Sequence, residues 1–462
     1  MQDEPAGGRG EHGGQKTGFL TVNDLTYVLE PDLSVAVNRT FKKHFFQSQV
    51  YNHNQRAICI LNSGADYIDT RRSYLSFELT VANTGVFGKY GSACNVIDSV
   101  TISTRSGDQL CQIREFALLQ NMMQPVTYDG DWYAGVGQLM GVGEKLTANV
   151  SRRFLIPLYI LSPFFAYGRL MPAMLMSGLR IEIEWTEPAD VLQVAATAST
   201  NTACTITLPY FNLCSVQLSD SIQRALNEQS ATNGLEIVYC DYDDTSTTMD
   251  KGANRIHCEV RKACSRALKA FARLQYVKPS NKNDSFRAEA GFPFTQYQWQ
   301  LGSLYFPQQP VKTTDATRPD LMAPEAFAHV LDAVNKFHGE ARSPMLGFNL
   351  QRDAEFYDSK EQEAAPQHSV ADPGRTLQTD YGRTGTYLID QHILGVGLER
   401  TSLFNLAGVP INNSRVLSLN AEMAANTLEV VADGDTAKRH LTIFLKYVKM
   451  ARVFMNNVEV EQ

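Results

Sequence analysis

The chain has 462 residues, of which 42 are Lys or Arg and 49 are Asp or Glu, so its formal net charge is −7. Hydrophobic residues make up 44 % of it and charged residues 20 %, which is too apolar for an intrinsically disordered protein. The modest content of Lys and Arg argues against a protein whose main task is to neutralise nucleic-acid phosphates. The length predicts about three domains, or fewer if the domains are built from strands.

The N-terminal residues 1–18 are rich in Gly and mixed in charge, so we expect a flexible arm without the apolar core of a signal peptide. The longest uncharged apolar stretch, residues 154–168, contains two prolines and is too short for a membrane helix. The sequence therefore predicts a protein that does not span a membrane. We do not expect secretion by a signal of its own.

The cysteines contain no Cys-x-x-Cys pair and none stands near a His at zinc-finger spacing. They are scattered through apolar stretches, where free buried thiols in a reducing compartment are the expected state. We therefore expect neither a metal site nor a disulfide framework from Cys59, Cys94, Cys111, Cys204, Cys214, Cys240, Cys258 and Cys264.

Strand patterns dominate the rest of the chain. Residues 75–81 and 179–185 alternate apolar and polar side chains with the period of two that a strand with one buried face requires. Turn-rich pieces separate these strands from the others, and the helices do not alternate with them as in a parallel α/β sheet. The pattern predicts an all-β protein of sandwiches or barrels. Further strands are expected at residues 96–103, 154–160, 205–213, 235–240, 271–277, 297–306, 387–397, 416–423 and 440–450.

Three segments have helical spacing. The first covers residues 111–123 with Ile113, Phe116 and Ala117 on one face, and the second begins at Ser219, a candidate N-cap. The third covers residues 324–338, with a proline in its first turn and a glycine after its end.

The order of these elements repeats along the chain. In each half a pair of strands precedes a helix and further strands follow it, and the two helices start roughly 210 residues apart, which predicts two copies of one β-rich unit. We expect the first unit at residues 19–218, a linker helix at residues 219–230 and the second unit at residues 231–462. Residues 339–383 are polar and aperiodic, so we expect a long exposed loop within the second unit.

Two glycine-rich stretches resemble nucleotide-binding loops only superficially. The run from Gly135 to Gly141 has the wrong glycine spacing and lacks the strand, helix and acidic residue of a dinucleotide site. We interpret it as a flexible loop. Residues 13–17 lack the first glycine of a phosphate-binding loop and fall in the N-terminal arm.

Two sets of carboxylates are candidates for catalytic or metal-binding groups. Asp241, Asp243, Asp244 and Asp250 follow a predicted strand, but the loop glycine and terminal glutamate of a calcium site are missing, so we expect a solvated turn. Glu182 and Glu184 share one face of a predicted strand, as paired glycosidase carboxylates do, and are interpreted as its solvent-facing side. We name no catalytic, cofactor-binding or metal-binding residue and expect no cofactor and no enzymatic activity.

A basic segment at residues 38–56 carries Arg39, Lys42, Lys43 and Arg56 without an acidic residue. It allows a non-specific, salt-sensitive contact with nucleic acid. The interleaved Phe41, Phe45 and Phe46 favour a packed strand with one basic face at least as much.

Several stretches in chain order resemble a viral major capsid protein of the double jelly-roll lineage, most closely its polinton-like virus and virophage branch. Together they extend over about residues 40–462, and their order carries the resemblance. They are residues 67–77 (YIDTRRSYLSF), residues 91–93 leading to 97–102 (IDSVTI) and on to 106–107, residues 301–307 (LGSLYFP) and residues 445–457 (LKYVKMARVFMNN).

The resemblance implies two tandem eight-stranded antiparallel jelly-roll sandwiches, with a few short helices in the loops between strands. It also implies a homotrimer that forms a pseudo-hexagonal capsomer of an icosahedral shell around double-stranded DNA, and hence a place in the virion after assembly in the host cell. Its implied partners are copies of itself, neighbouring capsomers, minor capsid or penton proteins, and non-specifically the packaged DNA.

Two alternatives share the all-β prediction. A carbohydrate-active β-sandwich enzyme would need a cleft with paired carboxylates, and the sequence has only three tryptophans (Trp132, Trp185 and Trp299) to form sugar platforms. A host-binding fibre or spike module would expose loops at the strand ends without a lateral surface that forms a shell.

Overall fold

The structure is a computed structural model. It describes residues 36–87, 91–188, 191–192, 202–249, 253–276, 294–313, 324–337, 393–399, 408–422, 439–454 and 458–461. The expected N-terminal arm at residues 1–18 and the expected long loop at residues 339–383 lie outside the described residues.

The first half of the chain folds into two antiparallel sheets. One sheet has the order β1 (Ala36–Phe45), β11 (Cys204–Leu218), β4 (Tyr67–Val81) and β9 (Arg152–Pro157), and the short β2 (Val50–Asn52) also pairs with β11. The other sheet has the order β3 (Arg56–Ile60), β10 (Arg180–Trp185), β6 (Ile97–Ser103) and β7 (Gln109–Ile113).

The second half folds in the same way. One sheet has the order β12 (Leu235–Met249), β20 (Arg439–Val453), β14 (Cys264–Tyr276) and β17 (Ile393–Gly397); β18 (Val409–Ile411) pairs with β14, and β21 (Val458–Glu461) with β20. The other has the order β13 (Arg255–Val260), β19 (Leu417–Glu422), β15 (Gln296–Leu301) and β16 (Leu304–Lys312).

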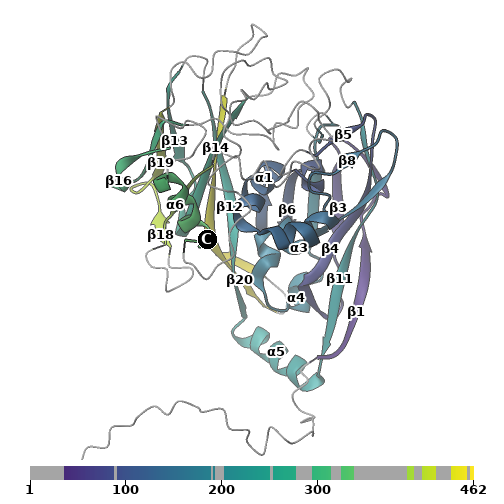
Figure 1. Ribbon diagram of the computed structural model, residues 1–462. Coiled ribbons are helices and arrows are strands. Elements are labelled where there is room, and N and C mark those ends of the chain that lie inside the picture. Colours follow the sequence, from purple (N-terminus) through teal and green to yellow (C-terminus); the bar gives the residue numbers. More distant parts are fainter. Residues whose placement is uncertain are drawn as a thin grey trace, which may run out of the picture.

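The two halves share one topology. When the eight main described strands of each half are numbered in chain order, both halves contain one sheet of order 1-8-3-6 and one of order 2-7-4-5. This is the strand order of a jelly roll. In both halves a helix lies between the fifth and sixth strand: α1 (Phe116–Thr127) in the first and α6 (Pro324–Ala333) in the second. The expected fold of two tandem jelly rolls is confirmed, and Figure 1 shows them side by side.

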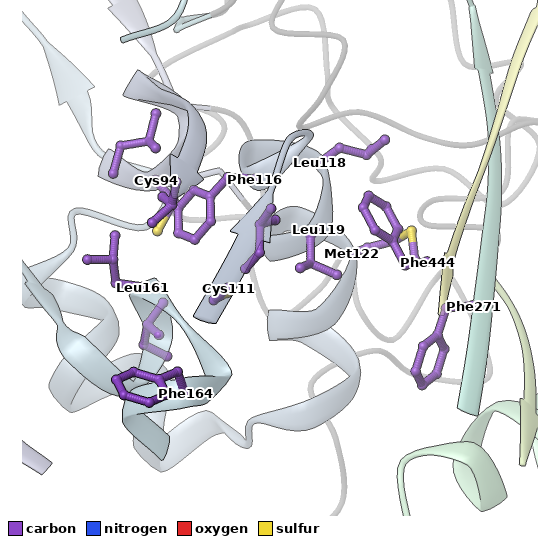
Figure 2. Close-up of a cluster of buried hydrophobic side chains, with 14 of the residues drawn as sticks. Cys94, Cys111, Phe116, Leu118, Leu119, Met122, Leu161, Phe164, Phe271 and Phe444 are labelled. Atoms are coloured by element: carbon purple, nitrogen blue, oxygen red, sulfur yellow. The ribbon is translucent and has the colours of Figure 1, made fainter. Parts of the chain in front are cut away.

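The cores are built from the alternating strands that the sequence predicts. In β10 the burial alternates residue by residue, with Ile181, Ile183 and Trp185 inside. Buried apolar side chains continue from one half into the other without interruption. Figure 2 shows Leu119 and Met122 of α1 facing Phe444 of β20, so the helix of the first half packs on a sheet of the second. Each fully buried side chain of this size contributes about 1.5–3 kcal/mol to stability.

Several predicted boundaries are wrong. The helix expected at residues 324–338 ends at Ala333. The strand expected at residues 154–160 ends at Pro157, where α3 (Leu158–Leu161) begins. The strand expected at residues 297–306 is a hairpin of β15 and β16, and Gly302 supplies the positive φ of +61° that its turn requires. The helix expected from residue 111 starts at Phe116, because the preceding residues form β7.

The short helices that the resemblance implies for the loops between strands are present. The linker helix is α5 (Asp220–Thr232). Ser219 is its N-cap residue, as predicted, but the Ser219 side chain forms no capping hydrogen bond. The remaining described elements are the 3-10 helices η3 (Ala93–Val96) and η5 (Pro163–Tyr167), the π-helix η4 (Tyr133–Gly137), α2 (Gly130–Trp132), α4 (Ala173–Met176) and the strands β5 (Gly85–Val86) and β8 (Lys145–Leu146).

Candidate functional site

The acidic cluster of the sequence is not a solvated turn. Strand β12 continues to Met249 and pairs with β20 along its whole length, from Leu235 opposite Val453 to Met249 opposite Arg439. Asp241 therefore lies midway along β12, an edge strand of its sheet, and is only 2 % exposed. The prediction was wrong because the polar residues after Cys240 pair with β20, and this pairing extends the strand past them. Asp243 and Asp244 are partly buried in the same strand, and Asp250 lies outside the described residues.

Asp241 forms a buried ion pair with Lys449 of β20. The Lys449 Nζ lies 3.3 Å from the Asp241 Oδ2, and each side chain is 3 % exposed. The same ammonium donates to the backbone carbonyls of Leu110 at 2.7 Å and Gln109 at 3.3 Å. An ammonium has three protons to donate, so these three acceptors satisfy it.

This ammonium joins the two halves of the chain. Leu110 and Gln109 belong to β7 of the first jelly roll, whereas Lys449 and Asp241 belong to the second. The Tyr239 hydroxyl of β12 donates to the same Leu110 carbonyl at 2.8 Å. We call Lys449, Asp241, Tyr239 and the Leu110 carbonyl the junction cluster. In Figure 1, β12 lies at the boundary between the two jelly rolls.

Apolar and polar contacts surround the junction cluster. The Tyr239 ring meets Phe164 of η5 edge to face, with ring centroids 5.0 Å apart. The Tyr447 hydroxyl donates to the Asp241 Oδ2 at 3.2 Å. At the end of the linker helix, the Ser230 hydroxyl donates to the Val453 carbonyl at 3.2 Å, which holds α5 against β20.

Burial dominates the acid–base properties of the junction cluster. Burial raises the pKa of the Asp241 carboxyl, and the attraction of the Lys449 ammonium opposes that rise. Burial and the negative charge of Asp241 raise the pKa of the Cys111 thiol well above its usual range, although the Ser162 hydroxyl donates to its Sγ at 3.1 Å. Cys111 is therefore held as a thiol, which is a poor nucleophile. The geometry suits a structural connection.

All eight cysteines are free, and all but Cys240 are buried, as the sequence predicted. Among the residues that the structure describes, no three His, Cys, Asp or Glu side chains converge as metal ligands. Within the same residues no helix is long and apolar enough to cross a membrane.

Glu182 and Glu184 lie on the partly exposed face of β10, as predicted. Glu182 is bound by two arginines, with Arg180 Nε at 2.7 Å and Arg56 Nη1 at 3.2 Å. Glu184 accepts a hydrogen bond from the Ser99 hydroxyl at 3.2 Å. Both glutamates are thus bound by neighbouring side chains of their own sheet.

The glycine-rich run at residues 135–141 is a compact helical turn, which corrects the expected flexible loop. Gly135 and Gly137 lie in η4, and Gly141 has a φ of +69°. A Cβ on Gly141 would stand 2.5 Å from the Phe154 ring, so glycine is needed there for packing. Residues 13–17 lie outside the described residues.

The basic segment does not form a strand with one basic face. Its first part is β1, which has Lys42 and Lys43 on opposite faces because neighbouring strand residues alternate. Lys42 pairs with Asp66 at 2.5 Å. Phe41 and Phe45 are 53 % and 54 % exposed, and only Phe46 is buried. The prediction fails because β1 is the outermost strand of its sheet and has little to pack against.

One described groove lies on the outer face of β13, β19 and β15, with a volume of about 420 Å³. Its polar side chains mostly bind one another. Glu422 accepts from Arg255 Nε at 2.7 Å and from Gln296 Nε2 at 2.6 Å, and His257 Nδ1 lies 2.7 Å from Asn420 Oδ1. The groove is thus a polar sheet face whose side chains mainly bind one another.

Comparison by sequence finds no protein-family model and no curated protein that matches this chain. Comparison by structure finds viral capsid proteins. The PBCV-1 virus capsid aligns with a TM-score of 0.58 at 9 % identity, over 92 % of this chain and 97 % of that chain. The mavirus major capsid protein aligns with a TM-score of 0.53 at 11 % identity, over 100 % of this chain and 97 % of that chain.

The Faustovirus major capsid protein aligns with a TM-score of 0.55 at 8 % identity, over 94 % of each chain. This chain has the double jelly-roll fold. The alignments extend over both jelly rolls, so the shared fold includes their tandem arrangement.

Proposed function

We propose that this chain is a viral major capsid protein that assembles with copies of itself into the shell of a double-stranded DNA virus. The observation that carries the proposal is the repeated jelly-roll topology in one chain, which it shares along nearly its whole length with solved major capsid proteins. Under this proposal its place is the virion, and it has no catalytic activity.

The assembly unit in this proposal is a homotrimer. Two jelly rolls in each of three copies present six similar modules around one axis, which is the geometry of a pseudo-hexagonal capsomer. Closed symmetry repeats each contact in every subunit, so modest interfaces add up to a stable particle. The proposed units are residues 19–218 and 231–462, joined by the linker at residues 219–230, with an exposed loop at residues 339–383.

The junction cluster supports this role. A capsomer requires a fixed angle between the two jelly rolls of each copy, and a buried ammonium that binds both of them constrains that angle. Minor capsid or penton proteins are further partners in this proposal. Contact with packaged DNA would be non-specific and weakened by salt.

Light scattering and negative-stain microscopy of the expressed full chain test the proposal. We expect a trimer or larger assembly of the 51.4 kDa chain at micromolar concentration and physiological salt, with hexagonal outlines or closed particles in the images. A clean monomer would contradict it. Elongated projections without lateral contacts would favour a host-binding fibre or spike module, and glycan cleavage lost on Glu182→Gln would favour a carbohydrate-active enzyme.

A further inference from the structure

Strand β1 forms an open edge of the first jelly roll. Among the described residues it pairs with β11 alone, and Figure 1 shows it as the outermost strand. It is ten residues long, and an edge of this length exposes a row of backbone N–H and C=O groups that proteins usually cover. The Arg39 backbone N–H donates to the Asn38 side chain at 2.7 Å instead of to another strand, so a local contact partly shields the edge.

Most side chains of β1 are exposed to solvent, as its backbone edge is. Val37, Phe41 and Phe45 are 66 %, 53 % and 54 % exposed. Phe41, Lys43 and Phe45 share one face because strand residues two apart point the same way. Exposed large apolar side chains on an open edge mark a surface that another segment covers.

The charge of β1 limits what that segment is. Arg39, Lys42 and Lys43 are the only Lys or Arg side chains of β1, which has no Asp or Glu, and Lys42 already pairs with Asp66. The partner should therefore be apolar and free of Lys and Arg. The β1 strand of a second copy is disfavoured, because it would bring the same cations opposite one another.

The chain contains a segment with this chemistry directly before β1. Residues 19–30 (FLTVNDLTYVLE) are mainly apolar, include Asp24 and Glu30, and contain no Lys or Arg. Residues 31–35 follow and begin with Pro-Asp, a pair typical of turns. Connections of four or five residues are common in β-hairpins.

We propose that residues 19–30 add to the open edge of β1 of the same chain as an antiparallel strand, with residues 31–35 as the hairpin turn. With residue 30 opposite Ala36, Leu25 stands opposite Phe41 and Asp24 opposite Lys42. The added strand pairs with the open edge, places Leu25 beside Phe41, and adds Asp24 to the ion pair that Lys42 makes with Asp66. It also keeps the edge from recruiting other strands, a role beyond the proposed capsid function.

Hydrogen exchange measured by mass spectrometry tests the covering. The full chain is compared with a variant that lacks residues 1–30 and with a control that lacks residues 1–18. We expect β1 peptides to exchange about tenfold faster in the first variant and at the full-chain rate in the control, because only the first loses the covering strand. Equal β1 exchange in all three proteins overturns the inference.

A disulfide test identifies the chain that supplies the strand. The variant Leu25→Cys with Phe41→Cys is oxidised and mapped by peptide mass spectrometry and a non-reducing gel. The control pairs Leu25→Cys with Ile60→Cys, because Ile60 is 56 % exposed on another strand. We expect an intrachain link in the first variant only. An interchain link, or no link in a folded protein, overturns the inference, whereas the particle assay above decides the capsid function separately.

Discussion

Lys449 and Asp241 are 208 positions apart in the chain, yet the Lys449 Nζ lies 3.3 Å from the Asp241 Oδ2 inside the protein. The same Nζ reaches the Leu110 carbonyl of the other jelly roll at 2.7 Å. One buried ammonium thus links three strands and both halves of the molecule. Buried ion pairs are expensive to break because the remaining charge loses its partner.

The first prediction concerns Lys449→Met. This substitution keeps most of the side-chain length but leaves the Asp241 carboxylate buried without its cation, so we expect it to lower the free energy of unfolding by about 3–5 kcal/mol. Urea denaturation of the purified variant measures the loss.

The double variant Lys449→Met with Asp241→Asn serves as the control for this prediction. It removes both charges, so we expect it to regain at least about 1 kcal/mol relative to Lys449→Met, the positive coupling typical of residues in direct contact. Additive losses in the double-mutant cycle would contradict the ion pair.

The second prediction concerns the pH dependence of stability at Lys269. Burial, helped by the nearby Lys446 ammonium, lowers the pKa of Lys269 to about 8. Because the folded-state pKa lies below the unfolded value, Lys269 destabilises the fold while it is charged. The penalty is present below pH 8 and disappears as the pH rises towards 10.5.

Lys269→Met should therefore be more stable than the natural chain at pH 7, by up to about 3 kcal/mol. The difference should shrink steadily between pH 8 and 10.5, the window set by the two pKa values. Thermal or urea unfolding of both proteins across this range measures it, and titrating groups that do not interact with Lys269 cancel in the difference. A constant difference would show that packing, and not charge, separates the two proteins.

The third prediction concerns thiol reactivity. Burial raises the pKa of Cys59 to about 12 and that of Cys258 to about 11, so both remain thiols at neutral pH. We expect a thiol reagent at pH 8 to label no more than Cys240 in the native protein, since only that cysteine is partly exposed. All eight should react after denaturation, which provides the control. Rapid labelling of Cys59 in the native state would contradict the structure.

The repeat of the fold was readable from the sequence because it depends on local patterns. The alternation in β10 and the helical spacing from Pro324 onward each predict one element, and the order of such elements predicts the duplication. The position of Asp241 was not readable, because a run of aspartates resembles a turn unless the partner strand is known. Only the pairing with β20 places it beside Lys449.

A signal for Lys449 was nevertheless present. Leu445, Tyr447, Ala451 and Val453 alternate along β20 and are buried, and Lys449 occupies the same phase of that alternation. A lysine in a buried phase needs acceptors for its ammonium. The sequence does not specify that the acceptors are backbone carbonyls of another jelly roll, because that contact depends on how the two units pack.

The fourth prediction compares two glycines of the run that superficially resembles a nucleotide loop. Gly141 has a φ of +69°, and a Cβ there would stand 2.5 Å from the Phe154 ring and 2.9 Å from the Glu144 carboxylate. Gly135 lies in η4 with ordinary backbone geometry and nothing within 4 Å of an added Cβ. Gly141→Ala should therefore lower the free energy of unfolding by about 1–3 kcal/mol through backbone strain alone, and by more through the clash. Gly135→Ala should be neutral or slightly stabilising, because alanine restricts the unfolded chain. Urea denaturation of the two variants checks the contrast, and equal effects would mean that the glycines of this run serve chain flexibility and not packing.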